Sequence, residues 1–540
     1  MFCNKIDFLI MTYENIAYKI LEDAIKSSVY IDEKAREFFQ PKSEELEDIV
    51  GLSEKLYENF KVKGISLDIL RYKVGDEINP AFLKYITDNR DLVLLDWHLK
   101  DQSGEEESLK ILKEVVYSKN VHFAVVYTSE SRLENVLKNI LLYFSGLKEE
   151  DFKKIKEASE LYLDEVDFSD FHDINFNRFD IDIKKRIGIL FLKYKSQLVE
   201  FKKELGFTDN LCAIIKASLV NLIEPAYLSP EALTCPSHID FNNNIVVINN
   251  TIVLILEKKN NSPADLLENF KQHIIKDVDS FNTLLSLDFY NHIYKSSVIT
   301  NDNDISFPKE AILSHRKKLI DTDSGEYFNK FIDEILLEKI AISMRDRKSD
   351  LLSNAILNQL ELSSNLEDIL DSDIKKMNVF YNSFKLDKEN QYINFGDVFE
   401  MEGSSKFLIC ITPLCDCIRP QEKMKSNYFF AEGSVVDFNI AKNIGENAFI
   451  SYLDNKVIKW SNESKSNLEP IYIKPCQYKI LDSSNKILDN KIKVYYLNKE
   501  GIIREKILNY LGTIRPNYAQ RIANHAFSYP VRVGVDFVKI

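Results

Sequence analysis

Runs of apolar residues alternate with amphipathic stretches along the first third of the chain. A short β-branched run occupies residues 28–31, residues 65–72 are typical of a second strand, residues 92–95 read LVLL, and residues 121–127 read VHFAVVY. The stretches between them repeat apolar residues every three to four positions, as amphipathic helices do. Uninterrupted apolar strands that alternate with helices are typical of a parallel sheet covered on both faces. The pattern therefore predicts an α/β domain at residues 1–170.

The pattern changes twice in the rest of the chain. After residue 170 it is mainly helical, apart from a small strand pair around residues 238–256 with Asn-rich turns. From residue 391, short β-type runs are separated by Gly, Asn and Ser, and a helix at about 515–528 and a strand at 531–539 close the chain. We therefore predict an α/β domain at 1–170, a mainly helical middle domain at 171–390 and a β-rich domain at 391–540.

Polar residues suited to phosphoryl transfer follow three of the predicted strands. Asp32 and Glu33 follow the first strand, Asp96 follows LVLL, and Thr128 follows VHFAVVY. Because parallel strands end at the same edge of a sheet, these side chains are expected to meet there. Phosphoryl transfer to a carboxylate requires an Asp, further carboxylates that bind Mg²⁺, and donors for the phosphoryl oxygens. The sequence therefore predicts an acidic, magnesium-binding pocket around Asp96.

The order and spacing of these residues resemble the receiver domain of two-component response regulators. The receiver pattern is an acidic pair, then Asp-x-x-Leu/Met with a Gly eight residues after the Asp, and then a Thr or Ser about thirty residues further on. This chain has Asp32-Glu33, then Asp96-Trp-His-Leu with Gly104, and then Thr128. The motif covers the predicted α/β domain.

The resemblance implies a receiver-like, flavodoxin-like fold and a role in signal transduction or phosphorelay. Asp96 corresponds to the phosphoacceptor of the family, and Thr128 corresponds to its switch hydroxyl. The Mg²⁺ ligands that the resemblance implies are Asp32, Glu33, Asp96 and the main-chain carbonyl of His98.

Three departures from the receiver pattern change what is expected of the domain. The gap between the acidic pair and Asp96 is longer than usual by about twenty residues, and Lys100 stands where Pro is customary. We place the fifth strand at residues 160–166, ELYLDEV, which does not supply the Lys that ends this strand in receivers. Without that cation a phosphorylated form loses a charge-assisted contact. The domain is therefore expected to be either a phosphorylated switch or a receiver-like sensor that binds metal or a partner.

The whole chain also resembles long bacterial proteins with a divergent receiver domain, a helical middle and a β-rich end. The block that begins Phe395-Gly-Asp-Val-Phe and the tail that begins Pro516-Asn-Tyr-Ala-Gln resemble the start and the end of their β-rich module. Such proteins begin near a stretch like Met11-Thr-Tyr-Glu-Asn, so Met11 is an alternative start to Met1. The resemblance implies a non-enzymatic regulatory subunit of an anti-phage defence system. Its expected partners are a kinase or a GHKL-type ATPase, together with an effector.

A nuclease is the competing interpretation. Asp240, Glu257 and Lys259 have the order of a PD-(D/E)xK site, in which carboxylates hold Mg²⁺ and the Lys positions the attacking water. A surface hairpin that ends in charged residues has the same pattern. A third interpretation is an assembly subunit whose receiver fold serves only for docking.

Composition narrows these alternatives. The net charge is −14, and residues 1–390 carry 50 Lys and Arg against 68 Asp and Glu, so nucleic acid is a less favoured partner than protein. We find no Gly-rich phosphate loop, which argues against an ATPase activity of the chain itself. We also find no membrane span and no signal peptide, and the seven cysteines lack framework spacing. These features predict a cytoplasmic, multidomain protein.

Overall fold

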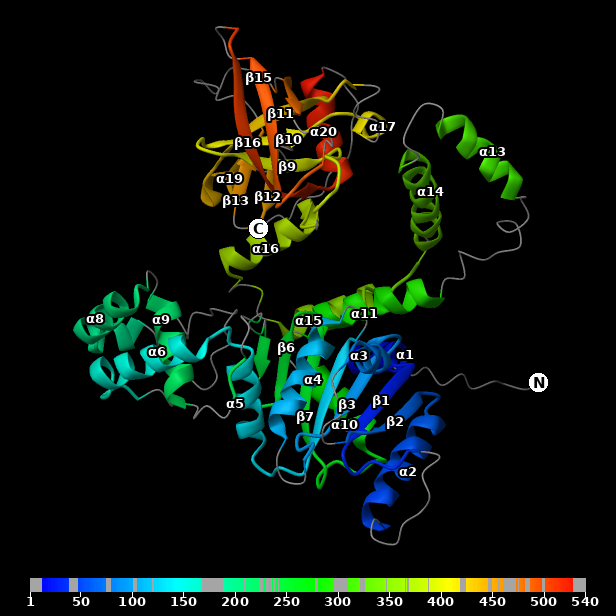
Figure 1. Cartoon of the computed structure of the whole chain (residues 1–540), viewed down its shortest axis with the longest axis vertical. Coiled ribbons are helices and arrows are strands. Elements are labelled where there is room, and N and C mark those ends of the chain that lie inside the picture. Colours follow the sequence, from blue (N-terminus) through cyan, green and yellow to red (C-terminus); the bar gives the residue numbers. More distant parts are fainter. Residues whose placement is uncertain are drawn as a thin grey trace. The chain divides into compact units, whose positions relative to one another are not determined.

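A computed structural model describes the chain between residues 12 and 527, with internal gaps (Figure 1). The described residues are 12–37, 47–73, 79–100, 104–118, 121–167, 188–207, 210–222, 227–229, 233, 236, 238–240, 242–276, 280–295, 309–320, 326–345, 347–364, 366, 369–386, 388–417, 424–444, 449–454, 456–460, 473, 475–480, 486–497 and 501–527. The chain divides into two compact units, residues 1–296 with 347–360 and residues 297–346 with 361–540. None of the helices in the described ranges is both long and apolar enough to cross a membrane.

The first unit contains a seven-stranded sheet with the order β2-β1-β3-β4-β7-β6-β5. The first five strands in this order are parallel, and β6 and β5 extend the sheet beyond β7 as an antiparallel hairpin. β3 and β4 are buried along their whole length, which agrees with their continuous apolar sequences. The strands are β1 (Ser27–Asp32), β2 (Ser66–Arg71), β3 (Leu92–Leu95), β4 (Phe123–Thr128), β5 (His238–Asp240), β6 (Ile245–Ile248) and β7 (Thr251–Glu257).

Helices cover both faces of this sheet, and each face has its own apolar core. One core joins α1, α2, α10, α11 and α15 to strand residues such as Tyr30 and Leu94. The other core joins α3, α4 and α5 to the strand residues that alternate with these and point to the opposite face, such as Val29 and Val93. Successive strand side chains point to opposite faces, so both cores require apolar residues at every strand position. The helices are α1 (Tyr13–Ala24), α2 (Glu47–Val62), α3 (Pro80–Thr87), α4 (Glu105–Tyr117), α5 (Leu133–Tyr143), α10 (Leu266–Lys276), α11 (Ser280–Lys295) and α15 (Asn354–Ser363).

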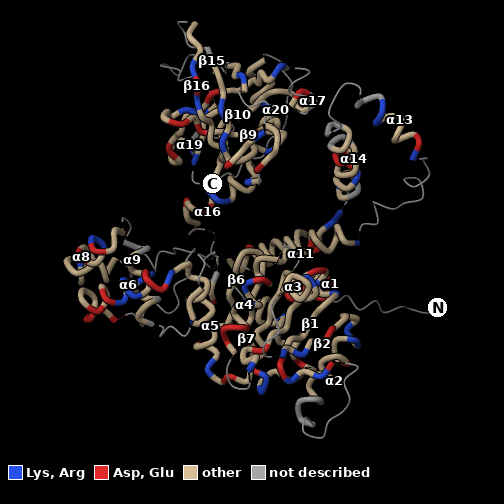
Figure 2. The backbone as a smooth tube through the Cα atoms, in the orientation of Figure 1, with Lys and Arg blue, Asp and Glu red and all other residues tan. Residues whose placement is uncertain are grey.

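A helical segment is inserted between α5 and the β5–β6 hairpin. Its helices α6 (Glu149–Tyr162), α8 (Lys195–Leu205) and α9 (Asn210–Leu222) share a separate apolar core that includes Phe152, Ile155 and Phe201. Acidic and basic residues are mixed along α6 and α8 (Figure 2), as on an ordinary solvated surface. The insertion therefore adds a small helical subdomain to the sheet.

The fifth strand predicted at residues 160–166 is wrong. Residues 160–162 are the end of α6, in which the buried residues Phe152, Ile155 and Ala158 recur at helical spacing. The fifth parallel strand is instead β7, which pairs with β4 along six residues from Phe123↔Ile252 to Thr128↔Glu257. The strand pair predicted around residues 238–256 thus consists of β5, β6 and β7 and belongs to the same sheet. The domain boundary predicted at residue 170 does not coincide with the edge of this sheet.

The second unit contains a closed β-barrel. The strand order runs β10-β9-β16-β15-β14-β11, and β10 also pairs with β11, so these six strands form a ring. All six contribute to one apolar core, with Phe399, Tyr428 and Val494 among its members. The prediction of a β-rich C-terminal domain is confirmed. The strands are β8 (Ser383–Phe384), β9 (Asp397–Met401), β10 (Lys406–Cys410), β11 (Asn427–Val435), β12 (Ile450–Leu453), β13 (Lys456–Lys459), β14 (Pro475–Ile480), β15 (Lys491–Leu497) and β16 (Ile503–Ile514).

The sequence block that begins at Phe395 contains Asp397, which forms a buried ion pair. Lys388 Nζ lies 3.3 Å from Asp397 Oδ2 with both side chains almost fully buried, and Thr513 Oγ1 donates a 2.6 Å hydrogen bond to Asp397 Oδ1. These contacts join β9 to the end of β16. The predicted terminal helix is α20, whereas the predicted strand at 531–539 lies outside the described residues. The helices of this unit are α13 (Lys309–Ile320), α14 (Glu326–Met344), α16 (Asp371–Asn382), α17 (Leu414–Cys417), α19 (Phe438–Ile444) and α20 (Pro516–Ala526).

Candidate functional site

The candidate site lies where four neighbouring parallel strands of the first unit end. Asp32 is the last residue of β1, Asp96 follows β3, Thr128 is the last residue of β4, and Lys258 follows β7. The backbone N–H of Asp96 donates to the carbonyl of Ile31, which fixes the Asp96 backbone beside β1. Sequence segments more than 200 residues apart thus meet at one edge of the sheet.

Asp32 is the most heavily bonded acid of the site. Its carboxylate accepts hydrogen bonds from Lys258 Nζ at 2.8 Å, from the backbone N–H of Lys34 at 2.7 Å and from the hydroxyl of Tyr30. Burial alone would raise the pKa of Asp32, but the Lys258 ammonium and these hydrogen bonds outweigh it and lower the pKa. Asp32 is therefore a permanent negative charge at neutral pH.

Asp96 is different, because it holds its proton more tightly. Its side chain is buried, Oδ1 lies 3.0 Å from Lys258 Nζ, and Oδ1 accepts a 3.0 Å hydrogen bond from the backbone of Trp97. Burial raises the pKa of Asp96 to about 7, assisted by the negative charge of Asp32 and opposed by Lys258. Two buried carboxylates share one ammonium, so an additional cation would favour the ionised form of Asp96.

Lys258 corrects the expectation that the fifth strand lacks its cation. Burial would lower the pKa of Lys258, but Asp32 and Asp96 outweigh this effect and raise it, so the side chain stays charged. The sequence signal was present, because the apolar strand TIVLILE is followed directly by two Lys. The signal is easily missed, because the fifth strand of a receiver is expected soon after β4, whereas 122 residues separate the end of β4 at residue 128 from the start of β7 at residue 251.

The predicted metal ligands are only partly brought together. Asp32 and Asp96 share Lys258, whereas the Glu33 side chain lies 3.3 Å from Lys34 Nζ. The ring of His98 lies 3.5 Å from the Glu105 carboxylate. The ligand predicted at this residue is the main-chain carbonyl of His98 and not its ring. Among the described residues no group of three His, Cys, Asp or Glu side chains is arranged to hold a metal ion. Two carboxylates and a carbonyl fit Mg²⁺, which keeps several of its waters in proteins.

The predicted switch residue is linked to Lys258 through the backbone. Thr128 is fully buried, and its hydroxyl accepts a 3.0 Å hydrogen bond from the backbone of Glu130. The backbone N–H of Lys258 donates to the Thr128 carbonyl at 2.7 Å. The neighbouring Tyr127 hydroxyl donates to the carbonyl of Asn261 beyond β7. A movement of the backbone at Tyr127 and Thr128 would therefore also move the end of β7 and the turn that follows it.

Gly104 shapes the loop that carries Asp96. Its φ of +98° lies in the left-handed region, and a Cβ there would lie 2.7 Å from the backbone nitrogen of Lys100. Ser108 in α4 secures the same loop, since its hydroxyl lies 2.9 Å from the carbonyl oxygens of both Asp96 and Trp97, which share its one hydrogen. The spacing between Asp96 and Gly104 thus has a steric cause.

The residues of the nuclease interpretation do not form a common site. Asp240 accepts hydrogen bonds from the backbone of Asn242 and Asn243, which closes the turn between β5 and β6. Glu257 accepts from the side chain of Asn260, and Lys259 is exposed. In the sheet, β6 lies between β5 and β7. Asp240 pairs with Ile245, and Ile245 pairs with Leu254, so Asp240 is aligned with Leu254 and not with Glu257. The geometry offers no support for this alternative.

Comparison with known protein families found a match in the first unit. The response receiver domain family matches residues 24–175, which include β1 to β4 and end before β7. Searches of curated proteins and of solved structures found no significant match. Receiver domains act in signal transduction, so the match supports a signalling or regulatory role. Residues 24–175 thus match the response receiver domain family, which is consistent with a receiver domain-containing protein.

Proposed function

We propose that this receiver domain is a phosphoryl-accepting switch with Asp96 as the acceptor. The observation that carries the proposal is Lys258, whose Nζ lies 2.8 Å from Asp32 and 3.0 Å from Asp96. A buried ammonium beside a buried carboxylate can form a charge-assisted hydrogen bond to a phosphoryl oxygen. Lys258 supplies the cation that the sequence alone left missing.

The reaction requires the ionised form of Asp96. A carboxylate oxygen attacks the phosphorus of the donor, the bond from phosphorus to the leaving group breaks, and an acyl phosphate forms. With its pKa at about 7, about half of the Asp96 side chains hold a proton near neutral pH. Lys258 favours the ionised form and remains positioned to bond the transferred group. Asp32, Asp96 and the main-chain carbonyl of His98 would hold Mg²⁺, which would neutralise charge on the phosphoryl oxygens.

In this proposal, phosphorylation changes the structure at the ends of β4 and β7. A phosphoryl group on Asp96 gives Lys258 and the Thr128 hydroxyl a new common partner. Because the backbones of these two residues are hydrogen-bonded, both strand ends respond together. In this proposal the chain is a non-enzymatic regulatory subunit that acts on a protein partner. On the resemblance of the whole chain, the partner is a kinase or GHKL-type ATPase with an effector, and the setting is anti-phage defence.

The test is a matched set of variants treated with acetyl phosphate and Mg²⁺. Intact mass spectrometry of the wild type and of Lys259→Ala should show the gain of one phosphoryl group, because Lys259 is exposed beside the site. Asp96→Asn should show none, and Lys258→Ala should be modified at least tenfold more slowly. Beryllofluoride with Mg²⁺ should raise the melting temperature of the wild type but not of Asp96→Asn.

Two results would overturn the phosphoryl-acceptor proposal. One is a folded wild type that responds to neither reagent, which would favour the alternative that the receiver fold serves only for docking in an assembly. The other is equal modification of Asp96→Asn, which would place the phosphoryl group on another residue.

A further inference from the structure

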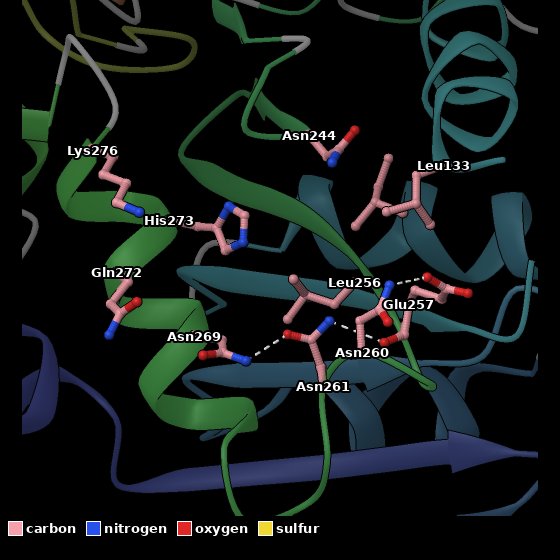
Figure 3. A pocket seen from close by; sticks show the side chains of 11 residues that line it. Leu133, Asn244, Leu256, Glu257, Asn260, Asn261, Asn269, Gln272, His273 and Lys276 are labelled. Atoms are coloured by element: carbon pink, nitrogen blue, oxygen red, sulfur yellow. Dashed lines mark hydrogen bonds between the residues drawn. The ribbon is translucent and has the colours of Figure 1, made fainter. Parts of the chain in front are cut away.

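A cavity of about 370 Å³ lies beside the receiver site, between β7 and α10 (Figure 3). Its walls come from the end of β7, the turn at Asn260 and Asn261, the β5–β6 turn at Asn244, and the exposed edge of α10. Its volume falls within the range of roughly 300–1,000 Å³ that small-molecule sites occupy. All of these elements belong to the first unit.

Hydrogen-bond acceptors line the cavity on both its α10 side and its β7 side. The Nδ1 atom of His273 is buried and has no hydrogen-bond partner within the described structure. Burial and the nearby charge of Lys276 lower the pKa of His273, and the backbone of Asn243 bonds to the ring, so the ring is neutral and Nδ1 is an acceptor. Glu257 adds a carboxylate that is only partly satisfied by the side chain of Asn260. Asn269 uses its N–H₂ group toward Asn261 Oδ1 at 2.8 Å, which leaves its oxygen as a further acceptor.

The side of the cavity that α10 forms, which includes His273, also carries a positive charge. Lys276 is the last residue of α10, and its side chain lies across the cavity from Glu257 in Figure 3. Leu133 and Leu256 provide an apolar wall near Glu257. A ligand that satisfies this lining brings N–H donors toward Glu257 and, across the cavity, a negative group toward Lys276.

The geometry points to a binding site for a small molecule with N–H donors at one end and an anionic group at the other. A free amino acid and a purine mononucleotide both have this chemistry, the first with an ammonium and a carboxylate, the second with ring or amino N–H groups and a phosphate. Asn and Gln side chains, which line this cavity, also recognise the edges of purine bases.

The same wall connects this cavity to the receiver site. Glu257 lines the cavity, and the next residue, Lys258, reaches Asp32 and Asp96. The carbonyl of Asn261, in the turn that lines the cavity, accepts a hydrogen bond from Tyr127, which precedes Thr128. A ligand that orders β7 and this turn would also order Lys258. Binding itself does not rest on the proposed phosphorylation, so Asp96→Asn should bind the ligand as the wild type does.

Isothermal titration calorimetry of the full chain tests the site with the standard amino acids, AMP and GMP as probes. We expect saturable binding of a member of one class, and which class binds distinguishes the two sources. Lys276→Ala, at an exposed helix position, should weaken binding about tenfold, which is about 1.4 kcal/mol. Glu257→Gln should weaken it similarly. Asn354→Ala, at an exposed position of α15 outside the cavity, is the matched control and should bind as the wild type does.

Two outcomes overturn the inference. One is the absence of heat from every probe at millimolar concentration while the protein is folded. The other is binding that Lys276→Ala and Glu257→Gln leave unchanged, which would place the ligand elsewhere. A failure of phosphorylation alone leaves this experiment unaffected, so the two proposals fail independently.

Discussion

Replacing Asp96 with Asn should stabilise the first unit at alkaline pH and leave its stability nearly unchanged in acid. Asp96 is buried beside a second carboxylate, and one ammonium serves both. Asn has almost the same shape and cannot ionise. The substitution therefore removes one buried negative charge and keeps the contact between Lys258 and Asp32.

The magnitude follows from the pKa of Asp96. Its value of about 7 in the folded chain lies about three units above the ordinary 3.8. The folded state therefore binds the proton more tightly than the unfolded state, and stability falls as the pH rises from about 4 to about 7. Each unit corresponds to about 1.4 kcal/mol, which gives an upper bound of roughly 4 kcal/mol. We expect Asp96→Asn to exceed the wild type by about 1–4 kcal/mol at pH 8 and to match it near pH 4.

The assay is urea unfolding without divalent cations, followed by tryptophan fluorescence. Trp97 is buried beside Asp96, and the chain has two Trp, so a Trp460→Phe background isolates the receiver signal. The control is Asp164→Asn, which removes an exposed acid and should show no such dependence on pH. A stability difference for Asp96→Asn that is constant between pH 4 and pH 8 would refute the reasoning, because Asp96 would then ionise normally in the folded protein.

Three further predictions concern stability at neutral pH, each measured by urea unfolding. Lys258→Ala leaves two buried carboxylates without a cation and should lower the free energy of unfolding by about 3 kcal/mol, whereas Lys259→Ala should change it by less than about 0.5 kcal/mol; equal effects would contradict the geometry. Gly104→Ala should cost about 1–3 kcal/mol through its left-handed backbone, whereas Gly51→Ala, in open space within α2, should be neutral or stabilising. Lys388→Ala strands a buried carboxylate and should destabilise the barrel by about 3 kcal/mol, as reported by Trp460 fluorescence; an unchanged barrel would show that the ion pair is dispensable.

Local sequence was sufficient to predict the strand ends that carry acids. β3 and β4 are short, continuously apolar and bounded by polar residues, so their limits follow from burial alone. Asp32, Asp96 and Thr128 lie at strand ends as predicted, because a parallel sheet brings all its carboxyl ends to one edge. Their roles in phosphoryl transfer remain predictions.

Local sequence was not sufficient for features that depend on distant partners. The segment ELYLDEV contains residues that suit a strand, but Phe152, Ile155 and Ala158 before it pack on α8 and α9, so its first three residues end helix α6 and the next residues form a turn. Likewise, Glu257 and Lys259 resemble a nuclease motif when read alone. Only the pairing of β7 with β4 shows that Lys258, between them, is the residue that faces the acids.

The position of β7 shows why distance along the chain is a poor guide to receiver residues. The connection from β4 to β7 has 122 residues, against about 12 for a minimal crossover. Loop closure costs about 0.6 kcal/mol for each doubling of length, so this tenfold increase costs only about 2 kcal/mol. The inserted helices reduce that cost further, because their own core shortens the flexible part of the connection. β7 buries its apolar side chains between the two cores, and each fully buried aliphatic side chain contributes about 1.5–3 kcal/mol, which outweighs the longer loop. A receiver can therefore accept a whole subdomain before its last strand, and its missing Lys should be sought after any later strand with a fully apolar sequence.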